Sequence, residues 1–160
     1  QTDIIIGTKM GYAVRFNENQ VRNMGRAATG VRGVNLRQDD HVVGASVISD
    51  NQEVLVITEK GYGKRTLASE YATKGRGGKG MKTANITEKN GPLAGLMAVN
   101  GDEDLMIITN TGVIIRTNVA NISQTGRATL GVKVMRLDKG AQIVTFTSVA
   151  AENEKEVDEE

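Results

Sequence analysis

The residues best suited to chemistry in this sequence are arginines framed by glycines. Three six-residue units read Gly-Arg-x-x-x-Gly, and they span residues 25–30, 75–80 and 126–131. An arginine offers a planar fork of donors that fits phosphate oxygens, and the neighbouring glycines keep side chains away from the loop's own N–H groups. We therefore expect Arg26, Arg76 and Arg127 to contact phosphate groups.

Further basic residues accompany these units. A basic residue follows two positions after the last glycine of each Gly-Arg-x-x-x-Gly unit, and two more lysines lie in or beside the middle unit. An arginine also stands four positions after the glycine that opens each repeat. The full set of candidate phosphate contacts is Arg26, Arg76, Arg127, Arg32, Lys82, Lys133, Lys74, Lys79, Arg15, Arg65, Arg116 and Lys64. The arginines at 15, 65 and 116 are weaker candidates, because an arginine on a hairpin strand can pair within its own blade instead.

Other chemistry finds less support. The middle unit also fits the G-x-G-x-x-G pattern of dinucleotide loops, but no helix-forming run follows Gly80, as that pattern requires. His41 and the acids at 102–104 are expected to be solvated loop charges, so we predict no catalytic residue, no metal and no cofactor. A nucleotide site and a purely structural turn remain the alternatives to phosphate contact.

The elements that position these arginines repeat along the chain. Three 26-residue stretches starting at residues 11, 61 and 112 align without a gap, and a period near 50 residues is typical of arrays of stacked units. Short apolar runs before each opening glycine, such as "EVLVI", predict β-hairpins, and "HVVGASVI", "PLAGLMAV" and "QIVTFTSV" predict further strands.

We therefore predict an all-β fold of propeller-like blades, each of four antiparallel strands. The repeats occupy residues 1–150, with cores at 4–48, 54–99 and 105–149. Closed rings typically have about 4 to 8 blades, so three blades are expected to be part of a larger wheel.

Composition adds a charge asymmetry. Residues 1–151 carry 19 basic and 13 acidic side chains, whereas 152–160 carry six acids and one lysine. We expect residues 151–160 to be a disordered acidic tail. Cysteine is absent and no apolar run approaches the roughly 20 residues of a membrane span, which favours a cytoplasmic protein without a membrane partner.

The blades resemble those of the family of DNA gyrase A C-terminal domains. The stretches "GYGKRT", "GGKG", "ITEKNG", "LMIITNTGVIIRT" and "ISQTGRATLGV" carry this resemblance over about residues 1–149. "KGRGGKG" at 74–80 matches the last five positions of the family's signature box, but Lys74 stands in place of glutamine and Gly75 in place of a basic residue. It is similar to a degenerate box in a later blade.

The resemblance implies a β-pinwheel whose neighbouring blades exchange strands and whose basic perimeter wraps double-stranded DNA with little sequence specificity. It implies a non-catalytic role in negative supercoiling by a bacterial type II topoisomerase, with the rest of gyrase A and, through it, gyrase B as partners, in the nucleoid. The corresponding C-terminal domain of topoisomerase IV and a propeller-type protein-interaction module are the alternatives.

Overall fold

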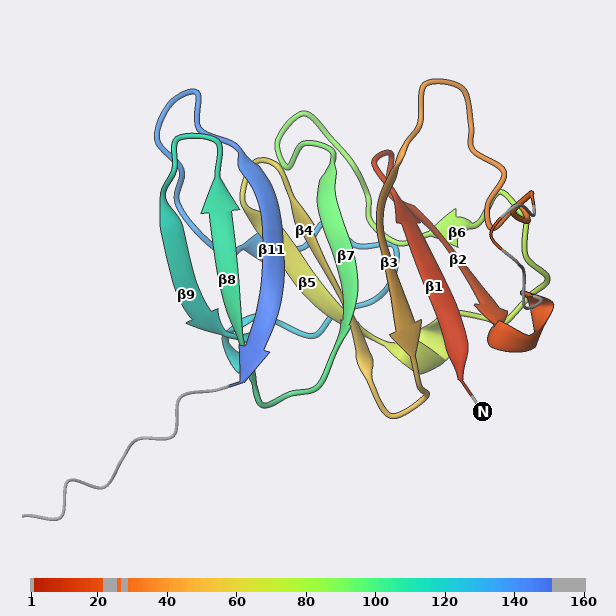
Figure 1. The fold of residues 1–160 in the computed structure, drawn as a ribbon. Helices are drawn as coiled ribbons and strands as arrows, with labels where there is room; N and C mark the ends of the chain where they lie inside the picture. Colours follow the sequence, from red (N-terminus) through yellow and green to blue (C-terminus); the bar gives the residue numbers. More distant parts are fainter. Residues whose placement is uncertain (1, 22–25, 27–28, 151–160) are drawn as a thin grey trace, which may run out of the picture.

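The computed structural model describes residues 2–21, 26 and 29–150 (Figure 1), so the predicted acidic tail lies outside the described residues. In these residues the chain forms β-strands and short 3-10 helices and no α-helix, which confirms the all-β prediction. The first repeat contributes β1 (Asp3–Thr8), β2 (Tyr12–Asn17), η1 (Glu18–Gln20) and β3 (Val42–Ile48). The second contributes β4 (Glu53–Thr58), β5 (Tyr62–Leu67), η2 (Ala68–Glu70), β6 (Met81–Lys82) and β7 (Leu93–Val99). The third contributes β8 (Glu103–Thr109), β9 (Ile114–Asn118), η3 (Val119–Asn121), β10 (Val132–Lys133) and β11 (Ile143–Ala150).

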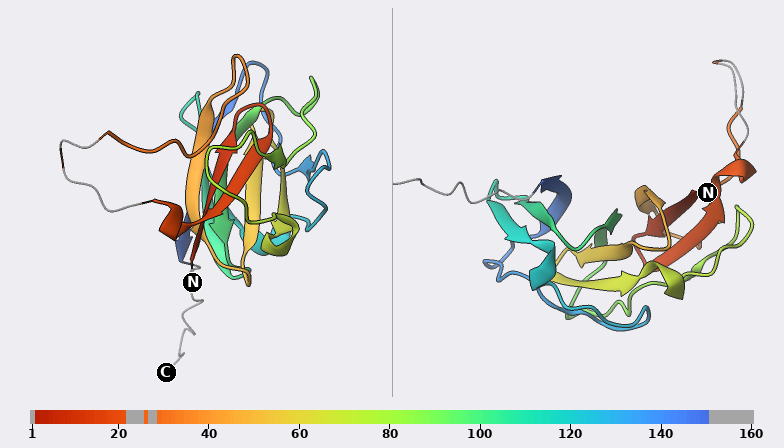
Figure 2. Two further views of the ribbon diagram at one scale, coloured as in Figure 1. Left: turned by 90° about the vertical axis from the view of Figure 1, so that its right-hand side faces the viewer. Right: turned by 90° about the horizontal axis from the view of Figure 1, so that it is seen from below.

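These strands form three antiparallel sheets that stand side by side as blades. Their strand orders are β3-β1-β2-β6, β10-β5-β4-β7 and β11-β8-β9. Seen from below, the sheets follow an arc, with β3, β7 and β11 on its concave side (Figure 2). The blades are propeller-like, as predicted, and the segment around residues 120–137 runs along the convex side.

Neighbouring blades exchange strands. The two-residue strand β6 belongs to the second repeat but pairs with β2 of the first, and β10 of the third repeat pairs with β5 of the second. In both cases the pairing places a lysine opposite a tyrosine, Lys82 opposite Tyr12 and Lys133 opposite Tyr62. Each of these two repeats therefore supplies the outermost strand of the blade before it.

The last glycines of the second and third units make this exchange possible. Gly80 and Gly131 have φ of +85° and +87°, in the left-handed region that favours glycine. A Cβ at these positions would lie 2.6 Å from the Ala13 carbonyl oxygen and 2.9 Å from the Gly63 carbonyl oxygen. The incoming loop can therefore approach the backbone of the neighbouring blade only where the side chain is missing.

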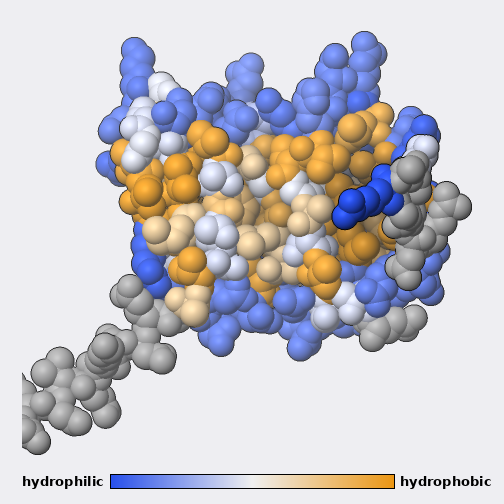
Figure 3. Space-filling view, viewed as in Figure 1, coloured by the Kyte–Doolittle hydropathy of each residue, from blue (hydrophilic) through white to orange (hydrophobic). Residues whose placement is uncertain are grey.

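The core lies between the blades. The central strand β4 sends Val54 and Val56 into a cluster shared with the first sheet, and Leu55 and Ile57 into a cluster shared with the third. Alternate residues of a strand face opposite sides of its sheet, and each side of β4 is covered by a neighbouring blade. All four side chains are therefore buried. The concave side carries exposed valines of β3 and β11, and Figure 3 shows apolar side chains across this face with hydrophilic ones above and below it. In the described part of the chain, no helix is long and apolar enough to cross a membrane.

Candidate functional site

The second and third of the predicted arginine units lie in loops that lead into the exchanged strands, whereas half of the first unit, residues 25 and 27–28, lies outside the described residues. We call residues 75–82 and 126–133 the exchange loops, since they end in β6 and β10. Each loop is hydrogen-bonded to the preceding blade before its glycine unit begins. The Lys74 N–H donates to the Arg15 carbonyl at 2.8 Å, and the Thr125 N–H donates to the Arg65 carbonyl at the same distance. Both glycine units are therefore held at the outer edge of the neighbouring sheet.

The unit arginines bond to the backbone of the preceding repeat with part of the guanidinium. Arg127 Nη1 donates to the Lys82 carbonyl at 2.7 Å, and Arg76 Nη1 donates to the equivalent carbonyl, that of Arg32, at 3.2 Å. Arg76 Nε also donates to the Gln20 carbonyl at 3.0 Å. The remaining donors of both side chains stay available at the surface. Arg26 is exposed as well, and residues 22–25 and 27–28 on either side of it lie outside the described residues.

Most of the predicted cations lack acidic partners. Within residues 2–21, 26 and 29–150, no carboxylate lies within 4 Å of the basic groups of eight predicted residues. Seven of the eight are exposed and Arg127 is half-buried; the eight are Arg26, Arg32, Lys74, Arg76, Lys79, Lys82, Arg127 and Lys133. Six of the eight lie in or directly beside the exchange loops, and unpaired cations that lie close together attract a polyanion.

Lys64 has a different position from the one predicted. Its side chain is buried, and its Nζ donates to the carbonyls of Gly126, Arg127 and Thr129 at 2.9, 2.5 and 2.9 Å. Burial lowers the pKa of Lys64 to about 8, Glu70 opposes this shift, and the nearby Arg127 adds to it. We therefore correct the expectation for Lys64, because an ammonium group enclosed by an exchange loop cannot reach DNA. It anchors the Arg127 loop instead.

The strand arginines are also engaged inside the protein. Each pairs with an acid twelve positions earlier: Arg15 with Asp3, Arg65 with Glu53 and Arg116 with Asp104, at 2.8 to 2.9 Å. Arg15 also donates to Asp50 and to the Ala68 carbonyl of the next repeat, and Arg65 donates to the Ile122 carbonyl. Arg15 is only 4% exposed, so it is corrected to a structural residue. Arg65 and Arg116 follow the alternative of pairing within the blade.

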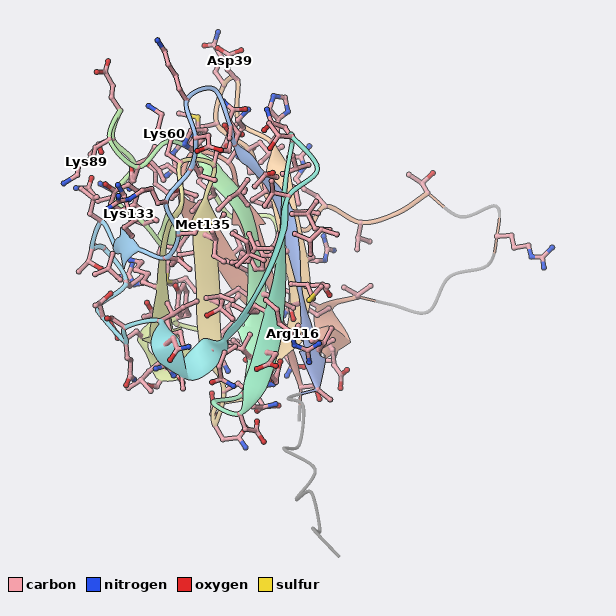
Figure 4. The ribbon with its side chains drawn as sticks, turned by 90° about the vertical axis from the view of Figure 1, so that its left-hand side faces the viewer. Asp39, Lys60, Lys89, Arg116, Lys133 and Met135 are labelled. Atoms are coloured by element: carbon pink, nitrogen blue, oxygen red, sulfur yellow. The ribbon has the colours of Figure 1, made fainter. Side chains whose placement is uncertain are left out.

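The sequence reasoning missed a basic pocket between the second and third blades. Lys60, Lys89 and Lys133 surround Tyr62 in a cavity of about 360 Å³, and Figure 4 shows the three lysines on the same side of the molecule. Only Lys133 was predicted. A signal was available in the sequence, because Thr-Glu-Lys occurs at 58–60 and again at 87–89 and places a lysine in both turns.

A cofactor-binding arrangement is absent from the described residues. The loop at 75–80 leads into β6, not into the helix that a dinucleotide site needs. No group of three His, Asp or Glu side chains in the described parts of the chain is arranged to hold a metal ion. What the site can do chemically is bind anionic groups at the outer edge of successive blades.

Comparisons with known proteins point to one family. The sequence profile described as "DNA gyrase C-terminal domain, beta-propeller" matches residues 2–49, 52–100 and 103–150. The chain is 51% identical over 162 aligned residues to the DNA gyrase A protein of Staphylococcus aureus strain NCTC 8325, and equally to that of strain COL. The alignment covers all of this chain and 18% of each relative, so the chain spans under a fifth of their length.

Solved structures share the fold. A DNA gyrase A C-terminal domain superposes with a TM-score of 0.85 at 28% identity, over 91% of this chain and 50% of that one. The C-terminal domain of a DNA topoisomerase IV superposes with a TM-score of 0.88 at 24% identity, over 96% of this chain and 48% of that one. At that identity the second likeness concerns the fold alone.

Proposed function

Because the chain belongs to the family of DNA gyrase C-terminal domains, we propose that it binds double-stranded DNA along its exchange loops and bends it around the convex edge. The contacts are made by the eight exposed or half-buried cations defined above. Arg76 and Arg127 are the strongest candidates for phosphate contact, because they occupy equivalent places in successive blades and keep guanidinium donors free.

One observation carries this proposal: the six cations in and directly beside the exchange loops (Lys74, Arg76, Lys79, Lys82, Arg127 and Lys133) have no carboxylate partners among the described residues, whereas the strand arginines are all paired. A protein that used its arginines only for stability would pair both sets. Lysine and arginine contacts to phosphates release counterions and carry no sequence information. Little base preference is therefore expected.

The arc of the sheets explains why such binding would bend the duplex. Bending a site of 20–30 base pairs by 40–90° costs on the order of 1–6 kcal/mol. Phosphate contacts from one blade after another offset this cost, because they recur along a curved edge (Figure 2). A straight duplex would reach only part of the set.

Within a complete enzyme, this segment supports negative supercoiling by presenting bent DNA to the rest of gyrase A and, through it, to gyrase B. Its own role is DNA binding without catalysis. The setting is the bacterial cytoplasm, at the nucleoid.

Fluorescence anisotropy of labelled random-sequence duplexes of increasing length, titrated across a salt series, tests the proposal. The logarithm of the affinity should fall steeply with the logarithm of salt, at about 0.9 per phosphate neutralised. The variant carrying Arg76→Gln and Arg127→Gln keeps a side-chain donor at both positions, and its slope should be smaller by about 1.8.

Lys9→Gln is the matched control. Lys9 is a surface lysine whose Nζ lies 3.8 Å from Glu59, so its loss removes a charge that already has an acidic partner. We expect its slope to equal that of the unmodified protein. An unchanged slope in the double arginine variant would refute the assignment of the contacts, and binding that is insensitive to salt would refute the proposed function.

A further inference from the structure

The pocket between the second and third blades has the composition of an anion site. Its cations come from three segments: Lys60 from the turn after β4, Lys89 from the turn before β7, and Lys133 from β10. The rest of the lining includes Tyr62 and Gln142, which add an aromatic ring and an amide.

Two of the three lysines lie over one ring. The Nζ atoms of Lys89 and Lys133 lie 5.9 and 5.7 Å from the centroid of Tyr62, within the range of a cation–π contact. Lys60 Nζ donates to the Glu88 carbonyl in the neighbouring turn. In the described residues no carboxylate lies within 4 Å of any of the three ammonium groups. Three like charges around one cavity repel one another, and a bound anion would relieve that repulsion.

The backbone holds these positions in place. Lys133 is fixed by its pairing with Tyr62 and by the Val134 N–H, which donates to the Gly61 carbonyl at 2.8 Å. The turn that bears Lys89 is closed by the fully buried Asn90, whose Oδ1 accepts from the Thr87 N–H at 2.7 Å. The pocket is therefore preformed by strand exchange and by turn geometry.

The equivalent place in the first blade is built differently. The guanidinium of Arg37 lies 3.5 Å from the centroid of Tyr12, and its Nη1 donates to the Lys79 carbonyl at 2.7 Å. Met10 stands where the second blade has Lys60, and in the third blade Val113 replaces the tyrosine. In the described repeats, a ring with several lysines that have no acidic partner occurs only at Tyr62.

We propose that this pocket holds one phosphate group between Lys60, Lys89 and Lys133, with Tyr62 beneath the lysines. For a backbone phosphate the inference rests on the proposed function and adds Lys60 and Lys89 to the DNA path. Free inorganic phosphate offers the same chemistry, and the two sources are separated by experiment.

Nuclear magnetic resonance of protein carrying ¹³C-labelled tyrosine provides the test. The chain has three tyrosines, so three ring signals report on the pocket and on two controls, Tyr12 beneath Arg37 and the buried Tyr71. We expect duplex DNA, and separately inorganic phosphate, to shift the Tyr62 signal more than the other two. The Lys60→Gln/Lys89→Gln variant should lose both shifts, and the salt slope of its DNA binding should fall by about 0.9, as for one phosphate.

The outcomes separate this inference from the proposed function. If neither duplex nor phosphate shifts Tyr62, while Arg76→Gln/Arg127→Gln still lowers the salt slope, the pocket is refuted and DNA binding stands. If the protein fails to bind duplex, the proposed function falls. In that case, a phosphate-induced shift of the Tyr62 signal that the lysine variant abolishes establishes a free-phosphate site. If phosphate causes no shift of the Tyr62 signal, the pocket is refuted as well.

Discussion

Replacing Lys64 by methionine tests whether a buried lysine holds the Arg127 loop. The ammonium group donates to three carbonyls of one exchange loop and lies 3.3 Å from Thr129 Oγ1. The other two repeats have Val14 and Ile115 at this position, so an apolar side chain fits the blade. Lys64→Met therefore removes the donor with little change in packing.

The expected loss of stability is set by the carbonyls left behind. A buried acceptor that loses its partner costs about 1–3 kcal/mol. Water can reach part of this loop, because Arg127 is half-buried and Thr129 is exposed. Removing a buried charge also returns some free energy. We expect a net destabilisation of about 1–3 kcal/mol at pH 7, and weaker DNA binding because the Arg127 loop loses its anchor.

The dependence on pH gives a sharper signature. The pKa of Lys64 falls from 10.5 to about 8 on folding, so between these pH values the unfolded chain binds more protons than the folded one. The free energy of unfolding of the unmodified protein should therefore rise with pH above about 8, by at most about 1.4 kcal/mol per pH unit. Lys64→Met should lack this rise.

Urea unfolding at several pH values between roughly 7 and 9.5 measures both effects. The upper limit avoids Tyr71, whose pKa is raised by burial to about 12, so that its contribution to stability declines only above its ordinary pKa of 10. Parallel pH profiles for the two proteins would refute the reasoning. So would equal stability at pH 7 combined with unchanged DNA affinity.

Three further changes test the packing and the ion pairs. Gly131→Ala should destabilise by about 1–3 kcal/mol in thermal unfolding, since it combines positive φ with a close backbone contact, whereas Gly75→Ala, which meets nothing within 4 Å, should be near neutral. Asp3→Asn should destabilise the protein at neutral pH. Burial alone would raise the pKa of Asp3, but the hydrogen bonds to its carboxylate outweigh burial and lower the pKa. The unmodified protein should therefore lose the stability that the Asp3 carboxylate contributes as the pH falls through the lowered pKa. Tyr71→Phe leaves the Thr83 hydroxyl without its 2.5 Å partner, should cost about 1–2 kcal/mol in urea unfolding, and should abolish the decline in stability above pH 10. Equal stability of Gly131→Ala and Gly75→Ala, or unchanged pH profiles in the other two variants, would contradict these expectations.

The repeat pattern was sufficient to predict the blades. Continuous apolar runs such as residues 53–58 indicated β-strands buried on both faces, and each side of β4 does meet a different core. The repeated glycines marked the loops that bear Arg76 and Arg127. Their contact with DNA phosphates stays a prediction.

The repeat pattern could not predict which partner each basic side chain binds in the folded protein. Arg65 and Arg76 are both arginines near glycines, yet one pairs with Glu53 on the adjacent strand and the other donates to a loop carbonyl of the preceding repeat. Lys64 adjoins Arg65, but its side chain points to the opposite face of the strand, where the next repeat's loop encloses it. Such differences depend on which segments become neighbours through strand exchange, and sequence spacing within one repeat does not contain that information.

Strand exchange also determines how the molecule carries mechanical load. The loop with Arg127 belongs to the third repeat, but its backbone is tied to the second sheet through β10 and through Lys64. A pull on this loop, such as the recoil of a bent duplex, is therefore resisted by two blades at once. The tension is shared along the row of blades and does not peel one strand from its own sheet, so the same links that assemble the arc would also make it stiff against a duplex bent as we propose.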